Sequence, residues 1–290
     1  IKFPPPGTLV TPVFPAPTNA RTFVILRLLG VLAGVLAKAT DGRMPADQET
    51  IRYTGIEGID EDGDWFFSRE ILGGGSGGRC YAGGSDAIHV VPDSKNLPAE
   101  FVEGRFPVRI EKLGLAADSG GAGKYRGGLG YQKEIRVLAD DAKFMSIADR
   151  SILSCWGLNG GKAGAPFKVT INPGADDEQV MDGLCDREPI DHGVLIRVET
   201  TGGGGWGDPL ERDVSLVRLD VLQGKVSQQA AEDDYGVVFQ AGSDVLEVDL
   251  EGTNALREAL TKDRGTPKFF DRGPGFQLLA GTSEAEVDQI

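Results

Sequence analysis

The fold is decided by Asp118-Ser-Gly-Gly-Ala-Gly-Lys-Tyr-Arg-Gly-Gly-Leu-Gly130, in which six of thirteen residues are glycine. Glycine loses more backbone freedom on folding than any other residue, so a cluster of this kind is costly. Such a cluster is used where the backbone takes a positive φ, where another backbone approaches closely, or where amide groups face a ligand. The sequence alone leaves these three uses open.

Segments beyond the glycine cluster are typical of short β-strands. Ile135-Arg-Val-Leu138, Phe167-Lys-Val-Thr-Ile171 and Val194-Leu-Ile-Arg-Val-Glu199 show full or partial alternation of apolar and polar residues, which suits half-buried strands. Short strands separated by Gly, Asp and Pro favour a sandwich or barrel-like domain. Residues 48–70 predict short strands joined by the turn Asp60-Glu-Asp-Gly-Asp64, which lacks the glutamate and flanking helices of an EF-hand calcium loop.

An apolar run at residues 23–37 predicts a long helix near the start of the chain. Asn19 is the expected N-cap, and the helix is expected to reach about Ala39. Arg27 interrupts the run, which is also shorter than the roughly 20 apolar residues that a bilayer requires. We therefore expect a buried helix that packs against other parts of the protein, either an absent half or a partner subunit.

Further helices are expected in the C-terminal third. Asp213 can cap a helix over residues 214–223, and Ser227 can cap a second helix that closes before Tyr235-Gly236. The rest of the prediction consists of short strands at residues 236–239 and 245–250, a helix at 254–262 and a peripheral tail at 263–290.

Together these segments predict an α+β fold. It consists of a β-rich glycine-turn domain, sandwich or barrel-like, with an N-terminal buried helix and C-terminal helices. Three parts are expected: an α+β segment at residues 1–104, the glycine-rich β domain with its terminal helices at 105–240, and a small strand-helix extension with a tail at 241–290.

Composition narrows the class of partner. The net charge of −14 and the pI near 4.7 argue against nucleic acid and anionic membranes, because both demand a basic surface. Cys80, Cys155 and Cys185 lie far apart, so neither a disulfide framework nor a zinc knuckle is indicated. The first residues, Ile1-Lys-Phe-Pro-Pro-Pro6, do not resemble a signal peptide. We expect a soluble cytoplasmic protein.

The glycine-rich loops do not match nucleotide-binding motifs. A P-loop requires GxxxxGK followed by Ser or Thr, and the Gly-Lys pairs at residues 123–124 and 161–162 fail at both ends of that pattern. The spacing GxGxxG occurs at residues 73–78 and 202–207, but neither segment sits convincingly between a predicted strand and a predicted helix. Direct nucleotide binding by this chain is therefore not expected.

Three motifs in the same order resemble the hydantoinase B / oxoprolinase family. They are Asp118-Ser-Gly-Gly-Ala-Gly123 with Arg126-Gly-Gly-Leu-Gly130, Trp156-Gly-Leu-Asn-Gly-Gly161, and Thr200-Thr-Gly-Gly-Gly-Gly-Trp-Gly-Asp-Pro-Leu210. The resemblance runs through nearly the whole chain. Members of that family are normally much longer, and this chain resembles their C-terminal half. The resemblance also includes the acetophenone and acetone carboxylase subunits.

The resemblance implies a division of labour between two components. ATP and Mg would be bound by a hydantoinase A-type partner, and the B component would act on the phosphorylated small-molecule substrate. A divalent metal, if the reaction uses one, would be held by the N-terminal half, and no metal ligand is assigned to this chain. No catalytic residue is assigned either.

The candidate substrate-binding residues surround the glycine motifs. Arg126 or Arg150 is the expected clamp for phosphate or carboxylate, with glycine amides as further donors. Under the alternative, Asp118 caps a turn, the arginines form structural ion pairs and the glycines permit tight packing. The full set of candidates is His89, Asp118, Ser119, Gly120, Gly121, Arg126, Asp149 and Arg150.

Two reactions and one non-catalytic role fit the resemblance. Cyclic-amide hydrolases of the family tend to have a second histidine two residues after the position of His89, where this chain has Val91. That difference favours ATP-dependent carboxylation of a ketone of the acetophenone type. ATP-dependent opening of a hydantoin, oxoproline or lactam is the alternative reaction, and a scaffold half of such a complex is the alternative role.

Overall fold

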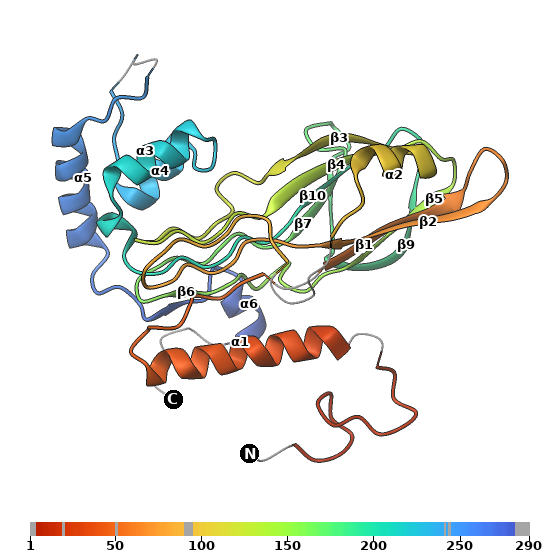
Figure 1. Cartoon of the computed structure of the whole chain (residues 1–290), viewed down its shortest axis with the longest axis horizontal. Coiled ribbons are helices and arrows are strands. Elements are labelled where there is room, and N and C mark those ends of the chain that lie inside the picture. Colours follow the sequence, from red (N-terminus) through yellow and green to blue (C-terminus); the bar gives the residue numbers. More distant parts are fainter. Residues whose placement is uncertain are drawn as a thin grey trace.

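The computed structural model describes residues 4–18, 21–49, 52–89, 95–240, 242 and 245–281. A long N-terminal helix flanks an elongated body that carries further helices at one end (Figure 1). The elements in chain order are α1 (Arg21–Ala39), β1 (Arg52–Ile59), β2 (Trp65–Leu72), α2 (Ala99–Arg105), β3 (Val108–Leu115), β4 (Tyr131–Val137), β5 (Ala142–Ile147), β6 (Gly157–Leu158), β7 (Lys168–Ile171), β8 (Gln179–Met181), β9 (Leu184–Ile190), β10 (Leu195–Glu199), a 3-10 turn (Pro209–Glu211), α3 (Val214–Leu222), α4 (Gln228–Tyr235), α5 (Leu250–Asp263), β11 (Phe270–Asp271) and α6 (Phe276–Ala280).

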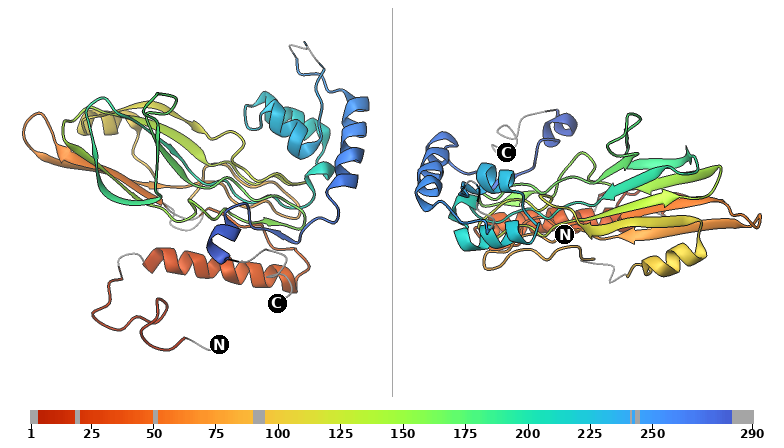
Figure 2. Two further views of the ribbon diagram at one scale, coloured as in Figure 1. Left: turned by 180° about the vertical axis from the view of Figure 1, so that it is seen from behind. Right: turned by 90° about the horizontal axis from the view of Figure 1, so that it is seen from above.

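Two open antiparallel sheets form a sandwich, as the alternating segments predict. One sheet has the order β2-β1-β5-β9 and the other β3-β4-β10-β7-β8, and Figure 2 shows them as two layers. Alternate residues of β4 and β5 are buried, since successive side chains of a strand point to opposite faces. Ile56 and Phe144 of the first sheet share one apolar core with Ile135 and Ile196 of the second.

The predicted hairpin is confirmed, because β1 and β2 pair in register from Arg52 with Leu72 to Ile59 with Trp65. β1 also pairs with β5, so hydrogen bonding crosses the predicted boundary between residues 104 and 105. The division into three parts stays a prediction.

The glycine-rich segments run side by side in extended conformation between the sandwich and the C-terminal helices. We call residues 44–49, 73–78, 119–130, 155–165 and 200–207 the glycine bundle, whose segments Figure 1 shows as closely spaced traces. Residues 202–207 lie at its centre, and each of their amides donates to another segment. The acceptors are the carbonyls of Ala165, Gly128, Asp47, Lys162, Tyr125 and Leu158, in that order, at 2.9–3.2 Å.

Two of the three pairs of amides that are three residues apart reach the same neighbouring segment. The amides of residues 202 and 205 reach residues 165 and 162, and those of 203 and 206 reach 128 and 125, whereas those of 204 and 207 reach two different segments, at residues 47 and 158. Three residues per turn is the repeat of the polyproline II helix, in which glycine is required wherever neighbouring chains crowd the axis. The central segment is therefore surrounded by neighbours on three sides rather than lying in a sheet.

Close backbone approach explains most glycines of this bundle, whereas Gly160 and Gly207 have a positive φ. A Cβ at Gly202 would lie 1.7 Å from the Ser119 carbonyl oxygen, and one at Gly203 would lie 2.1 Å from that of Ser76. Neither glycine has a positive φ. Their amides are bonded to other backbone groups, so the bundle is a packed interior and not a set of solvent loops.

Helix α1 lies where the sequence predicts, although Asn19 and Ala20 are outside the described residues. Within this chain only Leu26 and Ala37 of the helix are buried, so its expected cover by an absent half or a partner subunit stays a prediction. By length and composition, α1 is the one helix in the described part that could cross a membrane. The sandwich and bundle contact one side of it and leave the other side exposed.

The capped C-terminal helices are confirmed. The Asp213 carboxylate accepts the amide of Ser215 at the start of α3, and Ser227 Oγ accepts that of Ala230 at the start of α4. Helix α5 begins at Leu250, earlier than predicted, because Asp249 caps it; of the two expected strands only the bridge between Phe239 and Val248 forms.

The expectation of a peripheral tail is wrong for its first part. Strand β11 pairs with β6 of the glycine bundle. Phe270, in this strand, is buried against Trp156 with 5.1 Å between ring centroids. Residues 282–290 lie outside the described part of the chain.

Candidate functional site

A cleft of about 620 Å³ separates α1 from the glycine bundle. We call it the α1 cleft. Helix α1 forms one wall, the segment after β5 a second, and β11 with the residue that follows it a third. Its lining residues are Arg27, Gly30, Val31, Gly34, Val35, Lys38, Asp149, Arg150, Leu153, Trp156, Phe270 and Arg272. Asp149 and Arg150, two of the candidates from the sequence, thus line the α1 cleft.

Asp149 joins α1 to the interior of the bundle. Its carboxylate is 3.0 Å from Nε of Arg27 and 2.7 Å from Nη1 of Arg52. Arg52 is fully buried and also pairs with the buried Glu49 at 2.8 Å. Because a buried guanidinium is costly without partners, these carboxylates offset the cost of burying Arg52.

Arg150 is held tightly from two sides. Its guanidinium donates to the carbonyl of Ser154 and to the carboxylate of Asp47. Its φ is +68°, which is uncommon for a large side chain and indicates that the surroundings impose the conformation. Burial disfavours its charge, but the Asp47 carboxylate outweighs burial and raises the pKa of Arg150 above its ordinary value.

The cleft lining is cationic in an acidic protein. Burial, and then the neighbouring Arg150, lower the pKa of Arg27, although a guanidinium stays protonated in proteins. The lining contains four basic side chains and one acidic one. Asp47, Glu49 and Arg52 lie directly behind the lining. When their charges are included, the described residues of this region still carry more positive than negative charge. Such a region concentrates anions against the overall charge of −14.

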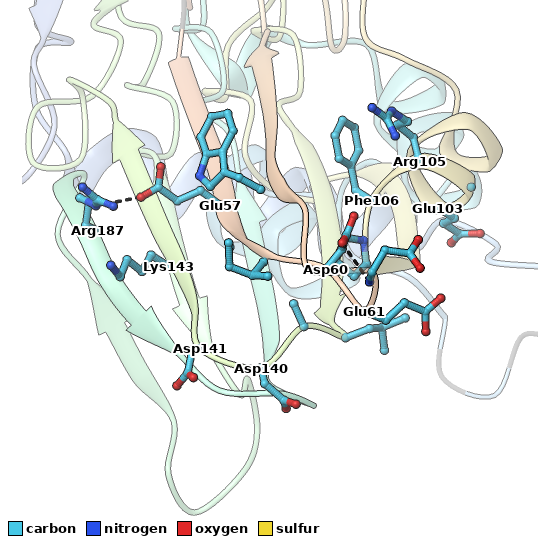
Figure 3. Close-up of a pocket in the computed structure, with 18 residues that line it drawn as sticks. Glu57, Asp60, Glu61, Glu103, Arg105, Phe106, Asp140, Asp141, Lys143 and Arg187 are labelled. Carbon is cyan, nitrogen blue, oxygen red and sulfur yellow. Dashed lines mark hydrogen bonds and ion pairs between the residues drawn. The ribbon is translucent and has the colours of Figure 1, made fainter.

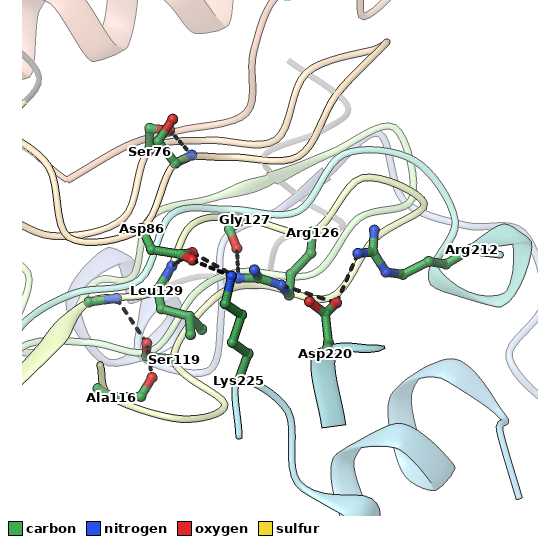
Figure 4. Close-up of polar contacts among 12 residues, drawn as sticks. Ser76, Asp86, Ala116, Ser119, Arg126, Gly127, Leu129, Arg212, Asp220 and Lys225 are labelled. Carbon is green, nitrogen blue, oxygen red and sulfur yellow. Dashed lines mark hydrogen bonds and ion pairs between the residues drawn. The ribbon is translucent and has the colours of Figure 1, made fainter. Parts of the chain in front are cut away.

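The other predicted arginine belongs to a separate, buried chain of charges (Figure 4). Arg126 lies between Asp86, at 3.3 Å, and Asp220, at 3.4 Å, and it donates to the Gly127 carbonyl at 2.6 Å. Lys225 pairs with Asp86 and Arg212 with Asp220. The guanidinium of Arg126 is therefore paired with carboxylates of its own chain. This matches the alternative prediction, in which the arginine forms a structural ion pair.

The remaining residues of the central motif also contact their own chain. Asp118 accepts the amide of Ser227 at 2.7 Å, and Ser119 donates to the Ala116 carbonyl while accepting the Gly130 amide. The Gly121 amide donates to the Gly203 carbonyl, and a Cβ at Gly120 would lie 2.3 Å from the Gly127 carbonyl oxygen. The structure therefore places Ser119, Gly120 and Gly121 in the bundle, and Asp118 beside it on the lining of another cavity of about 640 Å³. All four lie apart from the α1 cleft, and their role in substrate binding stays a prediction.

His89 is half-buried at the edge of the bundle and does not line the α1 cleft. Burial lowers the pKa of its imidazole, and a contact with Asn96 opposes that shift. Val91 lies outside the described residues. Across the residues that the structure describes, no group of three His, Cys, Asp or Glu side chains could hold a metal ion.

A second cleft, of about 820 Å³, lies at the hairpin end of the sandwich (Figure 3). Acidic side chains of the β1–β2 turn and of the β4–β5 connection surround it, and Glu57 pairs with Arg187 at 2.8 Å. Its charge suits neither phosphate nor carboxylate. The α1 cleft is therefore the better candidate for an anionic substrate.

Several residues of the α1 cleft were not predicted from the sequence, namely Arg27, Lys38, Trp156 and Arg272. One signal was present: α1 carries three basic residues and no acidic one, which is unusual in a chain with this net charge. The convergence of these residues depends on the folded arrangement of distant segments.

Comparison with known proteins gives consistent similarities. A model of the hydantoinase B/oxoprolinase family matches residues 1–209. The chain is 32% identical over 258 residues to the putative B component of the D-/L-hydantoinase of Pseudomonas sp. (strain NS671), covering 88% of this chain and 42% of that protein.

Two solved structures share the fold. The ATP-dependent caprolactamase from Pseudomonas jessenii matches with a TM-score of 0.76 and 24% identity, over 89% of this chain and 46% of that one. Nucleotide-free acetone carboxylase matches with a TM-score of 0.67 and 23% identity, over 90% and 40%. The chain thus spans less than half the length of these relatives.

Proposed function

Because the chain belongs to the hydantoinase B/oxoprolinase family, we propose that it is one component of an ATP-dependent enzyme complex. ATP and Mg are held by a hydantoinase A-type partner, which phosphorylates the substrate, and this component acts on the phosphorylated intermediate. A divalent metal, if required, belongs to the part of the family fold that this chain does not span. The complex is soluble and cytoplasmic.

The exposed face of α1 carries this proposal. Ile25, Leu28, Leu29, Leu32 and Leu36, which we call the outer face of α1, are between 40% and 54% exposed. Their spacing of three and four residues gives one apolar stripe, of the kind that is buried in a finished assembly. The chain spans less than half of its relatives, so we propose that the remaining part of the family fold covers this stripe.

The chemistry explains why two components are needed. Phosphorylation of an amide or enol oxygen turns an unreactive substrate into a reactive one. The second site then has to position that intermediate and the attacking water or bicarbonate, and orientation and electrostatics supply much of such catalysis.

We propose a cyclic amide as the first substrate class. The sequence match to a hydantoinase component covers 88% of the chain, and caprolactamase has a higher TM-score than acetone carboxylase. Ketone carboxylation is the second candidate, supported by the shared fold with acetone carboxylase. In the sequence, Val91 at the position of the second histidine favoured carboxylation. Residues 90–94, which include Val91, lie outside the described residues.

Purification of the tagged chain from its own cells tests the assembly. We expect an A-type ATP-binding partner and the remaining part of the family fold to co-purify with the wild type. Leu32→Asp should lose the remaining part, because a carboxylate on the outer face of α1 would be desolvated on assembly. Leu113→Asp, on the exposed side of β3, is the matched control and keeps the remaining part. Equal recovery with both variants would contradict the role of α1.

Turnover tests the reaction. ATP hydrolysis by the purified complex is measured with a panel of hydantoins, oxoproline and lactams, and with aryl ketones plus bicarbonate. Stimulation by cyclic amides supports the first class, and stimulation by ketones only when bicarbonate is present supports the second. A complex that forms but responds to neither class would favour the scaffold role for this chain.

A further inference from the structure

We infer that the α1 cleft binds a phosphate monoester with an apolar body. The class of ligand rests on the proposed function, in which a phosphorylated intermediate is handed to this component. The preference of the cleft for anions rests on its own residues. Its walls, its charged groups and its contrast with the other cavities each support this assignment.

The walls provide an apolar surface. The rings of Trp156 and Phe270 meet edge to face, and the side of α1 that carries Gly30 and Gly34 lies against the bundle. A Cβ at Gly34 would lie 3.8 Å from Trp156 Cζ2, and one at Gly30 would lie 3.6 Å from Asp47 Oδ1. These glycines thus serve the cleft side of α1, where Val31, Val35 and Leu153 complete the apolar lining.

Two of the cationic groups, Arg27 and Arg150, pair with carboxylates and contribute a fixed positive field. Lys38, in the last turn of α1, is exposed and forms no ion pair within the described residues, so it is available to a ligand. Arg272 enters from the opposite wall and is held over the rings of Phe270 and Phe276, with its Cζ 5.5 and 5.2 Å from their centroids. We assign Lys38 and Arg272 as the phosphate ligands.

The size and charge of the cavity fit such a ligand. A volume of about 620 Å³ is within the usual range of small-molecule sites, which is roughly 300–1,000 Å³. The cleft at the hairpin end is acidic. The third large cavity, about 640 Å³, is lined by two lysines and two aspartates, so its charges balance. Of the three, the α1 cleft has a clear excess of positive charge.

Fluorescence of Trp156 provides a direct test. The 290-residue chain carrying Trp65→Phe, which removes an exposed tryptophan outside the cleft, is titrated with phenyl phosphate, inorganic phosphate, benzoate and benzyl alcohol. Trp206, the other remaining tryptophan, does not line the cleft, and Trp156→Phe in the same background measures its contribution. We expect saturable quenching by phenyl phosphate, weaker binding of phosphate and benzoate, and no saturable effect of benzyl alcohol. Added salt weakens binding, since exposed charges are screened.

Variants then identify the groups responsible. Lys38→Ala and Arg272→Ala should each weaken phenyl phosphate binding by about threefold to tenfold, the effect of losing one partly exposed charge. Lys112→Ala, an exposed lysine of β3 that does not line the cleft, is the matched control and leaves the affinity unchanged. Circular dichroism confirms that each variant is folded.

The outcomes separate this inference from the proposed function. Absence of saturable quenching, equal affinity for benzyl alcohol, or full affinity in both cleft variants would overturn the anion site, whatever the complex catalyses. Equal affinity for phenyl phosphate and inorganic phosphate would keep the anion site and overturn the apolar part of the ligand. A complex without ATP-dependent turnover would remove the proposed function while leaving a measured anion affinity in place.

Discussion

At the scale of single residues, the glycine bundle depends on residues that have no Cβ. Gly203→Ala places a methyl group 2.1 Å from the Ser76 carbonyl oxygen, and neither backbone can move without breaking bonds to a third segment. We expect this variant to lose more than about 4 kcal/mol of unfolding free energy, or to fail to fold. Denaturant unfolding followed by circular dichroism measures the change.

A glycine outside the bundle is the matched control. Gly114, in β3, has no atom within 4 Å of a Cβ built on it, and its φ is not positive. Gly114→Ala should therefore stabilise the protein slightly, by about 0.5–1 kcal/mol, because alanine loses less backbone freedom on folding. If Gly203→Ala also stayed within about 1 kcal/mol of the wild type, close packing would not be the reason for the glycines.

At the scale of elements, local signals were sufficient where a helix end is defined by its own residues. Asp213 and Ser227 were identifiable as caps because the cap, the helix and the terminating glycine are neighbours in the sequence. The apolar run of α1 likewise predicted a helix. Its exposure could not be predicted, because that depends on which other surfaces are present.

The cap of α4 allows a quantitative test at this scale. Ser227→Ala removes the hydroxyl that accepts the Ala230 amide at 3.0 Å, and we expect it to cost about 1 kcal/mol of unfolding free energy. Ser227→Asn supplies a neutral acceptor, which avoids repulsion from Asp118, and should stay near the wild type. Thermal unfolding of both variants measures the difference, and equal loss in both would assign the effect to something other than the cap.

At the scale of the whole molecule, the charges around Asp86 join the glycine bundle to the C-terminal helices. Burial of Asp86 acts against its charge, but the Leu129 amide, Arg126 and Lys225 outweigh it and hold the pKa below the ordinary 3.8. Between the folded and unfolded pKa values, the unfolded chain binds more protons. The stabilisation is therefore complete above the unfolded pKa and is lost as the pH falls through the folded one.

Replacement of Asp86 should show this linkage. Asp86→Asn is expected to cost about 1–3 kcal/mol at pH 7, since it leaves Arg126 with one acidic partner fewer, and to reduce the loss of stability on acidification below about pH 4. Urea unfolding at a series of pH values measures both effects. Asp62→Asn, in the exposed hairpin turn, is the control, and a wild-type acid dependence in Asp86→Asn would contradict the assignment.

The candidate site was predictable in part at this scale. Asp149-Arg150 was visible as a charged pair after a strand, but Lys38 and Arg272 lie far away in the sequence and carry no motif. The central motif attracted the search for ligands because its glycines resemble anion-binding loops. In a glycine-rich loop the backbone amides can bond to other backbone groups or to a ligand. The sequence is the same in both cases, so it does not distinguish them.

The central position of residues 202–207 has a consequence for biosynthesis. The carbonyls that accept their amides come from segments beginning near residue 47, so the earlier segments leave the ribosome well before the strand that joins them. Until that strand emerges, the nascent chain holds several extended glycine-rich stretches with unpaired amides and carbonyls. Synthesis of residues 202–207 therefore completes the interior of the glycine bundle, and a ribosome that stalls before residue 207 leaves a product in which this interior is unpaired.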